Sequence, residues 1–142
     1  MATYNSLQYA NGPKSFNGAF PGNTVAFYFE ASPSAALTTS DTVNMGMVPK
    51  GFRLISATLE ATDMDSGSTI TLNVGDSGSA TRIFSASTVA QTGTISNTQT
   101  TTGHGYKYTD DTLITIVPAA GPATTTGTLY LTLIGRVEGG AS

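Results

Sequence analysis

Apolar and polar residues alternate along most of the chain from residue 24 onward. In the segment TVAFYFEA (24–31), Val25, Phe27 and Phe29 fall on one side and predict a buried face. A period of two residues is typical of a strand that covers a core with one face. The pattern therefore predicts β-structure from the first periodic segment.

The same reasoning identifies further strands along the chain. The expected segments are 42–48, 52–61, 69–75, 105–109, 112–118 and 128–137. The segment 82–87 fits either a short strand or a helical turn, and 88–97 shows no clear preference. Turn residues separate these segments at intervals of roughly 8–12 residues, and no segment predicts a helix of three turns.

The segment 52–61, FRLISATLEA, carries apolar residues on both sides of the alternation. We expect the side with Ile55, Ala57 and Leu59 to face the core.

These elements predict an all-β chain that folds as a single antiparallel β-sandwich, jelly-roll-like, with an extended N-terminal arm. We assign residues 1–23 to the arm and residues 24–142 to the β-sandwich domain. The abundance of threonine agrees with this prediction, because a β-branched side chain favours strands over helices.

The N-terminal segment 1–23 has no regular period but is rich in large apolar side chains. These are Tyr4, Leu7, Tyr9, Phe16 and Phe20. Solvated tails are usually poor in aromatic residues. The rings therefore either cover the core of their own domain or dock on another protein chain.

Composition excludes several classes of function. The 142 residues carry a net charge of −3 with only 11% charged residues, and the six basic residues are scattered singly. A nucleic-acid-binding face is therefore not expected. The absence of cysteine excludes disulfides and thiolate metal sites. No stretch approaches the ~20 apolar residues of a membrane span, and no signal peptide is evident. We expect no membrane partner, and synthesis in the cytoplasm.

The stretch TTTGHGYKYTDD (100–111) resembles the beginning of an active site, because it holds the only histidine of the chain, His104. A serine hydrolase would need a nucleophile on a fixed turn, and no G-x-S-x-G occurs. A single histidine also excludes a histidine-rich zinc site. We expect no catalytic residues, and interpret this stretch as the edge of a strand.

The aspartates of TDMDSGS (62–68) are the second candidate site. Asp63, Asp65 and Gly67 match the start of a calcium-binding loop, but Val74 occupies the position of the required glutamate. Asp76 could join the pair at one end of the sandwich. Turn aspartates more often bond their own backbone, so we expect no metal and no cofactor.

Three motifs together carry a resemblance to known proteins. They are DTVNMGMVPKG (41–51), DMDSGSTITLNVGD (63–76) and GHGYKYTDDTL (103–113). With their surroundings, about residues 36–137, they resemble a recurrent type of small virion protein of tailed bacteriophages. Proteins of this type are usually found among head and structural genes, and the best-described roles in that setting are capsid decoration or cement.

The resemblance implies a non-enzymatic capsid decoration (cement) protein. Such a protein binds the major capsid protein on the outer surface of the head, stabilises the shell and forms a homotrimer or homodimer. The arm residues listed above would then contact the capsid or a neighbouring subunit. The alternative within the virion is a head spike, fibre base or tail protein that presents the sandwich to the host surface.

The sequence gives less support to two other classes of protein, a carbohydrate-binding module and a depolymerase. A carbohydrate-binding module usually exposes tryptophan or tyrosine platforms, and this chain has no tryptophan. A depolymerase would need a pair of catalytic carboxylates beside a sugar-binding cleft, which the sequence does not show.

Overall fold

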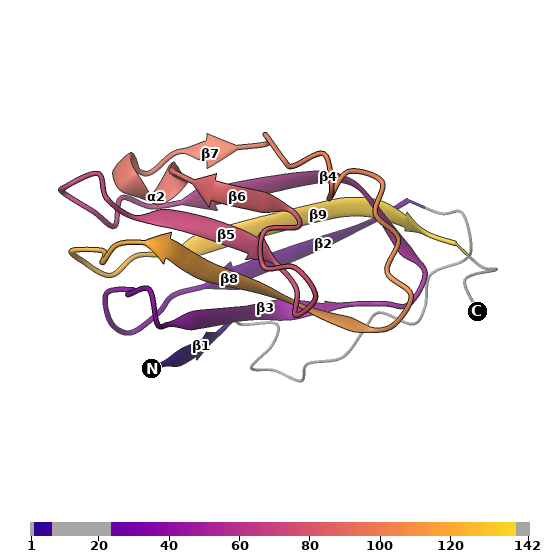
Figure 1. Cartoon of the computed structure of the whole chain (residues 1–142), viewed down its shortest axis with the longest axis horizontal. Helices are drawn as coiled ribbons and strands as arrows, with labels where there is room; N and C mark the ends of the chain where they lie inside the picture. Colours follow the sequence, from indigo (N-terminus) through magenta and orange to yellow (C-terminus); the bar gives the residue numbers. More distant parts are fainter. Residues whose placement is uncertain (1, 7–23, 139–142) are drawn as a thin grey trace.

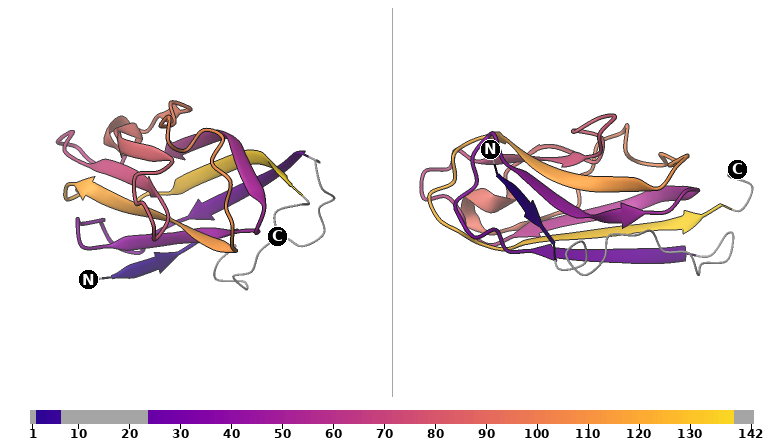
Figure 2. Two further views of the ribbon diagram at one scale, coloured as in Figure 1. Left: turned by 45° about the vertical axis from the view of Figure 1, so that its right-hand side comes forward. Right: turned by 90° about the horizontal axis from the view of Figure 1, so that it is seen from below.

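The computed structural model describes residues 2–6 and 24–138 as two β-sheets packed face to face (Figures 1 and 2). The elements, in chain order, are β1 (Thr3–Asn5), β2 (Thr24–Ala31), β3 (Thr42–Val48), β4 (Phe52–Ala61), β5 (Thr71–Gly75), β6 (Phe84–Ser87), α2 (Val89–Thr92), β7 (Ile95–Ser96), β8 (Thr112–Ala120) and β9 (Leu129–Val137). The prediction of an all-β sandwich is confirmed.

The two sheets have different strand orders. One sheet follows the order β1-β3-β8-β5-β6, and the other the order β2-β9-β4-β7. From β2 to β9, successive strands lie in opposite sheets, except that β5 and β6 are neighbours in the five-stranded sheet. This order is the double Greek-key arrangement of a jelly roll. All strand pairs are antiparallel except β1 with β3, which is parallel.

The core lies between the two sheets and is formed by the inward residues of the alternating strands. Phe29 of β2, Leu131 and Leu133 of β9, and Ile114 and Ile116 of β8 are at most 4% exposed. The residues of 24–31 and 69–75 that were predicted to face inward pack on the core. Segment 42–48 does not keep one period, because a register shift between Asn44 and Gly46 turns Val48 inward and leaves Met47 partly exposed. Burial of these side chains is the main source of the free energy of folding.

Strand β4 departs from the expected pattern. Its register with β9 shifts between Leu54 and Ser56, so Ile55 is 43% exposed while Leu54 is fully buried. A bulge adds one residue to one strand and so reverses the side on which later residues fall. Ala57 and Leu59 face the core as expected, but the prediction for Ile55 was wrong.

Two other segments were assigned imprecisely. The expected strand 105–109 is reduced to an isolated bridge between Arg53 and Lys107 at the edge of β4. The undecided segment 88–97 forms the four-residue helix α2 followed by β7, and 82–87 contributes strand β6.

The first described residues belong to the sandwich. Thr3, Tyr4 and Asn5 pair with Thr42, Val43 and Asn44 at the free edge of β3. The rest of the expected arm, residues 7–23, lies outside the described residues.

Candidate functional site

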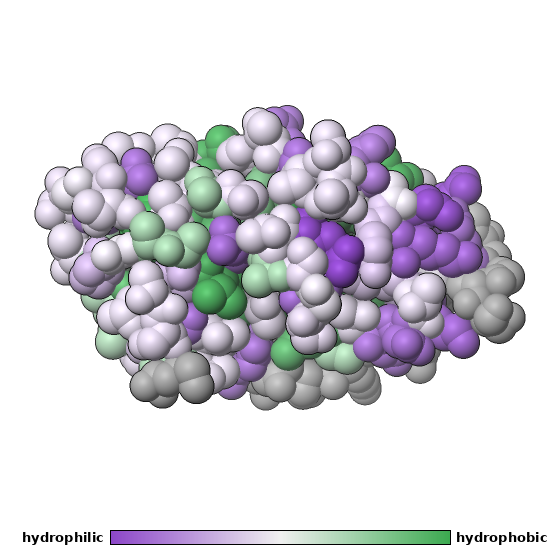
Figure 3. Space-filling view, viewed as in Figure 1, coloured by the Kyte–Doolittle hydropathy of each residue, from purple (hydrophilic) through white to green (hydrophobic). Residues whose placement is uncertain are grey.

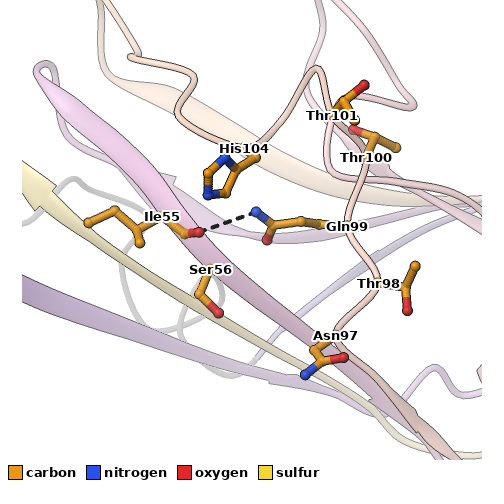
Figure 4. Close-up of a pocket in the computed structure, with 8 residues that line it drawn as sticks. All are labelled: Ile55, Ser56, Asn97, Thr98, Gln99, Thr100, Thr101 and His104. Carbon is orange, nitrogen blue, oxygen red and sulfur yellow. Dashed lines mark hydrogen bonds between the residues drawn. The ribbon is translucent and has the colours of Figure 1, made fainter.

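The connection from β7 to β8, residues 97–111, borders a hollow at the edge of β4. The hollow has a volume of about 520 Å³ and is lined by Ile55, Ser56, Asn97, Thr98, Gln99, Thr100, Thr101 and His104 (Figure 4). Gln99 Nε2 donates a hydrogen bond of 3.3 Å to the carbonyl oxygen of Ile55. All the lining side chains except His104 are non-ionisable.

His104 does not have the surroundings of a catalytic base. Its side chain is exposed, and no carboxylate lines the hollow beside it. The glycines on either side have structural roles: a Cβ at Gly103 would lie 2.3 Å from the carbonyl oxygen of Arg82, and Gly105 has a φ of 78°. These constraints explain the G-H-G sequence without any chemistry at the histidine.

Tyr106 of this connection packs against an ion pair that belongs to the β5–β6 turn. Arg82 Nε donates to Asp76 Oδ2 at 2.7 Å, and its guanidinium carbon lies 3.8 Å from the centre of the Tyr106 ring. Burial acts to raise the pKa of Asp76. Hydrogen bonds from Arg82 and from the backbone of Ser79 and Gly78 outweigh burial and hold that pKa below its ordinary value. The cluster joins the β5–β6 turn to the long connection.

Asp65 has the structural role that a turn aspartate normally has. Its carboxylate accepts backbone hydrogen bonds from Gly67, Thr69 and Ile70 at 2.6 to 2.8 Å and one from the Thr69 hydroxyl at 2.8 Å. These donors, beginning with Gly67, lower the pKa of Asp65 to about 2. Both carboxylate oxygens are already engaged, so they are poorly placed to bind calcium.

Asp76 does not join the other two aspartates. Asp63 and Asp65 precede β5 and Asp76 follows it, so the length of that strand separates them. Within residues 2–6 and 24–138, no three histidine, cysteine, aspartate or glutamate side chains gather in a way that could hold a metal ion. In the same residues, no helix is long and apolar enough to span a membrane.

Basic side chains gather around one carboxylate at the end of the sandwich where β9 stops. Glu138 lies 2.6 Å from Arg53 Nε, 3.0 Å from Arg136 and 3.5 Å from Lys107. The hydrogen bonds from Arg53, together with those from Arg136, lower the pKa of Glu138 to about 2. The sequence did not reveal this cluster, because its members are far apart along the chain.

Strand β1 is the edge strand of the five-stranded sheet and is held there by side-chain hydrogen bonds in addition to its pairing with β3. Ser6 is fully buried, and its hydroxyl donates to the carbonyl oxygen of Met45. The Asp41 carboxylate accepts hydrogen bonds from the backbone of Ala2 at 3.1 Å and of Thr38 at 2.9 Å. Tyr4 is half-buried and packs against the core.

The structure therefore places one of the five expected contact residues. Tyr4 covers part of the core of its own domain, which is one of the two roles considered for the aromatic residues. The other four, Leu7, Tyr9, Phe16 and Phe20, lie outside the described residues, and their contact role stays a prediction.

Comparison with known proteins adds evidence that the geometry alone does not supply. No family model and no curated protein matches this chain. A chain in the capsid asymmetric unit of cyanophage Pam1 is 36% identical, with a TM-score of 0.72 over 90% of this chain and 95% of that one. A chain in the capsid of Ralstonia phage GP4 has the same fold, with 23% identity, a TM-score of 0.73 and coverage of 95% and 97%.

The two-sheet fold and the match to the cyanophage capsid component together define a class: a β-sandwich structural protein of a phage virion. The chain belongs to the same family as the matched component of the cyanophage Pam1 capsid. It is a phage virion structural protein, as the sequence motifs suggested.

Proposed function

We propose that this protein is a non-enzymatic capsid decoration (cement) protein. It binds the major capsid protein on the outer surface of the phage head and stabilises the shell. It needs no cofactor for this role. The observation that carries the proposal is the 36% identity, over 90% of the chain, to a component of a capsid asymmetric unit.

Two further features support this role. An asymmetric unit is the part that symmetry repeats over a shell, so its components are present in many copies. A small protein in many copies can bind weakly at each site and still stay attached through multivalency. The jelly roll has few charges and many hydroxyl groups. Hydrogen bonds to Asp65 and the Asp76–Arg82 ion pair stabilise its turns. Such a domain suits a role that requires stability but no catalysis.

The N-terminal segment is the proposed contact with the shell or with a neighbouring subunit. The described part of that segment already occupies a sheet edge, where β1 is held next to β3. Beyond it, Leu7, Tyr9, Phe16 and Phe20 offer apolar side chains that can anchor an interface. We propose that these four, with Tyr4 supporting the segment from within the sandwich, fix the protein to its partner.

Co-sedimentation with phage shells that lack this protein tests the proposal. We expect saturable binding with a fixed number of copies for each copy of the major capsid protein. The absence of binding at any concentration would contradict a decoration role, and would favour the alternative of a spike, fibre-base or tail component.

Two matched variants test the contribution of the N-terminal segment. Replacing Leu7, Tyr9, Phe16 and Phe20 by serine leaves β1 in place, and we expect binding to the shell to fall by at least tenfold, that is about 1.4 kcal/mol. The control replaces four polar residues of the same segment by serine, namely Gln8, Asn11, Asn17 and Asn23. Equal binding by both variants would show that the apolar side chains do not make the contact.

A further inference from the structure

One side of the sandwich, where β6 ends the five-stranded sheet and β7 ends the four-stranded sheet, carries two adjoining hollows. The larger is the hollow of about 520 Å³ beside β4, and the second, of about 360 Å³, is lined by residues of β6 and β7. Thr98 lines both of them, so they meet at the start of the β7–β8 connection. A chain-like ligand that occupies one hollow can therefore extend into the other.

The lining of both hollows is rich in hydroxyl and amide groups. Residues 97–101 read Asn-Thr-Gln-Thr-Thr, and each of these side chains can both donate and accept hydrogen bonds. The second hollow adds the hydroxyls of Ser85, Ser87, Thr88, Thr94 and Ser96. Among the described residues, no aspartate, glutamate, lysine or arginine lines either hollow. The lining therefore suits a ligand that carries many neutral hydroxyl groups.

The wall that presents these groups is held in place by hydrogen bonds. The backbone N–H of Thr100 donates to the carbonyl oxygen of Ile83 at 2.8 Å, and its hydroxyl donates to the carbonyl oxygen of Arg82. On the side of β4, the Gln99 amide is bonded to the carbonyl oxygen of Ile55 (Figure 4). Because the wall is already ordered, a ligand that binds to it pays little conformational entropy.

Several lining groups are available to a ligand in the larger hollow. Within residues 2–6 and 24–138, no side-chain hydrogen bond is made by Ser56, Asn97, Thr98, Thr101 or His104. The Ile55 side chain is 43% exposed and adds an apolar contact. A sugar ring has hydroxyls at its edge and C–H groups on its faces, so it needs both kinds of partner.

An extended peptide fits this place less well than a sugar chain. β7 pairs with Leu59 and Glu60 of β4, and no described strand lies beside the Ile55 part of β4 on this side. The Gln99 amide already bonds the carbonyl oxygen of Ile55, as a neighbouring strand would. Covering an edge in this way is a common means of preventing the addition of another strand.

We propose that the two hollows bind a neutral polysaccharide, of the kind that coats cell surfaces. The hydroxyl and amide groups of residues 97–101 bond the sugar hydroxyls, and Ile55 contacts the C–H face of a ring. Recognition relies on hydrogen bonds instead of on the aromatic platform that the chain lacks. This activity is additional to attachment to the shell and does not depend on it.

Electrophoresis of the purified full-length chain in native gels that contain a polysaccharide tests the proposal. The neutral probes are dextran, mannan, galactan and xylan, and the anionic probe is heparin. We expect at least one neutral polymer to retard the protein in a concentration-dependent manner, and heparin to have no such effect.

A matched pair of variants locates the binding. Thr98→Ala with Thr101→Ala removes two exposed hydroxyls from the hollows, and we expect the dissociation constant to rise by at least about fivefold, because two hydrogen bonds to the ligand are lost. The control is Thr125→Ala with Thr126→Ala, two exposed threonines of the β8–β9 connection that line neither hollow. Melting temperatures measured in parallel show whether each variant keeps the fold.

Four results would overturn the proposal. The first three are a protein that no neutral polymer retards, retardation by heparin alone, and equal binding by the wild type and the Thr98→Ala, Thr101→Ala variant. The fourth is a protein that binds no neutral polymer but loses binding to phage shells in that variant, which would assign the hollows to a protein partner. Because the gels contain no shells, a failure here leaves the decoration role unaffected.

Discussion

Asp65 organises the β4–β5 turn through one carboxylate that accepts four hydrogen bonds. A charged acceptor with several donors is among the stronger polar interactions in a fold. The D-x-D-x-G motif predicted this kind of turn, because an aspartate side chain readily accepts a hydrogen bond from the backbone N–H two residues further on. The number of bonds could not be predicted, since the donors at Thr69 and Ile70 depend on the path of the chain.

The lowered pKa of Asp65 predicts acid sensitivity. A carboxyl group with a pKa of about 2 in the folded state, against the ordinary 3.8, adds stability above pH ~4. That contribution is lost as the pH falls through about 2. Replacing Asp65 by asparagine should lower the melting temperature at pH 7 by several degrees and flatten the acid dependence. Thermal unfolding between pH 2 and pH 7 measures both effects.

Asp63→Asn is the control for this prediction. Asp63 is exposed and accepts one backbone hydrogen bond of 3.2 Å from Asp65. We expect a smaller change in its melting temperature and an acid dependence close to that of the wild type. Equal effects of the two substitutions would show that Asp65 has no special role in the turn.

At the scale of elements, the bulge in β4 decides which residues enter the core. The alternation of residues 52–61 is compatible with a regular strand whichever side faces the core. The sequence contains no signal for the extra residue at Ile55. The long strands β2, β8 and β9 follow their periods and could be predicted, whereas β3 has a register shift between Asn44 and Gly46 that its sequence did not indicate. The short elements β1, β7 and the Arg53–Lys107 bridge could not, because two or three residues carry no period and depend on tertiary contacts.

The bulge predicts that substitutions at two neighbouring residues change the free energy of unfolding by very different amounts. Leu54→Ala should reduce the free energy of unfolding by about 2–5 kcal/mol, because it leaves a cavity in the core. Ile55→Thr should change it by no more than about 1 kcal/mol, since the side chain is exposed. Urea unfolding measures both values. The reverse order of the two effects would contradict the bulge at this position.

Strand β1 predicts a specific cross-link. Asn5 and Asn44 are register partners whose side chains hydrogen-bond at 3.1 Å, and neighbouring strands lie about 4.8 Å apart, within the reach of a disulfide. The chain has no cysteine of its own. The double variant Asn5→Cys and Asn44→Cys should therefore oxidise to a disulfide within one chain and run as a monomer on a non-reducing gel.

Covalent dimers of the double variant would contradict this arrangement and would indicate that β1 is exchanged between copies. The single variant Asn44→Cys controls for dimers that form through random collision of exposed thiols.

At the scale of the whole molecule, charge is distributed unevenly along the strands. At the end that carries the β2–β3 and β4–β5 connections, the charged residues described are the acids Glu30, Asp41, Glu60, Asp63 and Asp65. Toward the other end lie the described basic residues, namely Lys50, Arg53, Arg82, Lys107 and Arg136, together with the acids Asp76, Asp110, Asp111 and Glu138, so five positive charges outnumber four negative ones there. Figure 3 shows hydrophilic residues gathered near that end. Such a molecule has a preferred orientation in a charged environment, which favours one way of docking on a shell.

The central claim of this account is that the protein decorates the outer surface of the phage head. A comparison of electron cryo-microscopy maps of heads assembled with and without the protein tests it most directly. We predict additional density the size of one jelly roll, repeated over the outer surface at symmetry-related positions. Heads that are identical in the two maps, with the difference confined to the tail or to a single vertex, would contradict it.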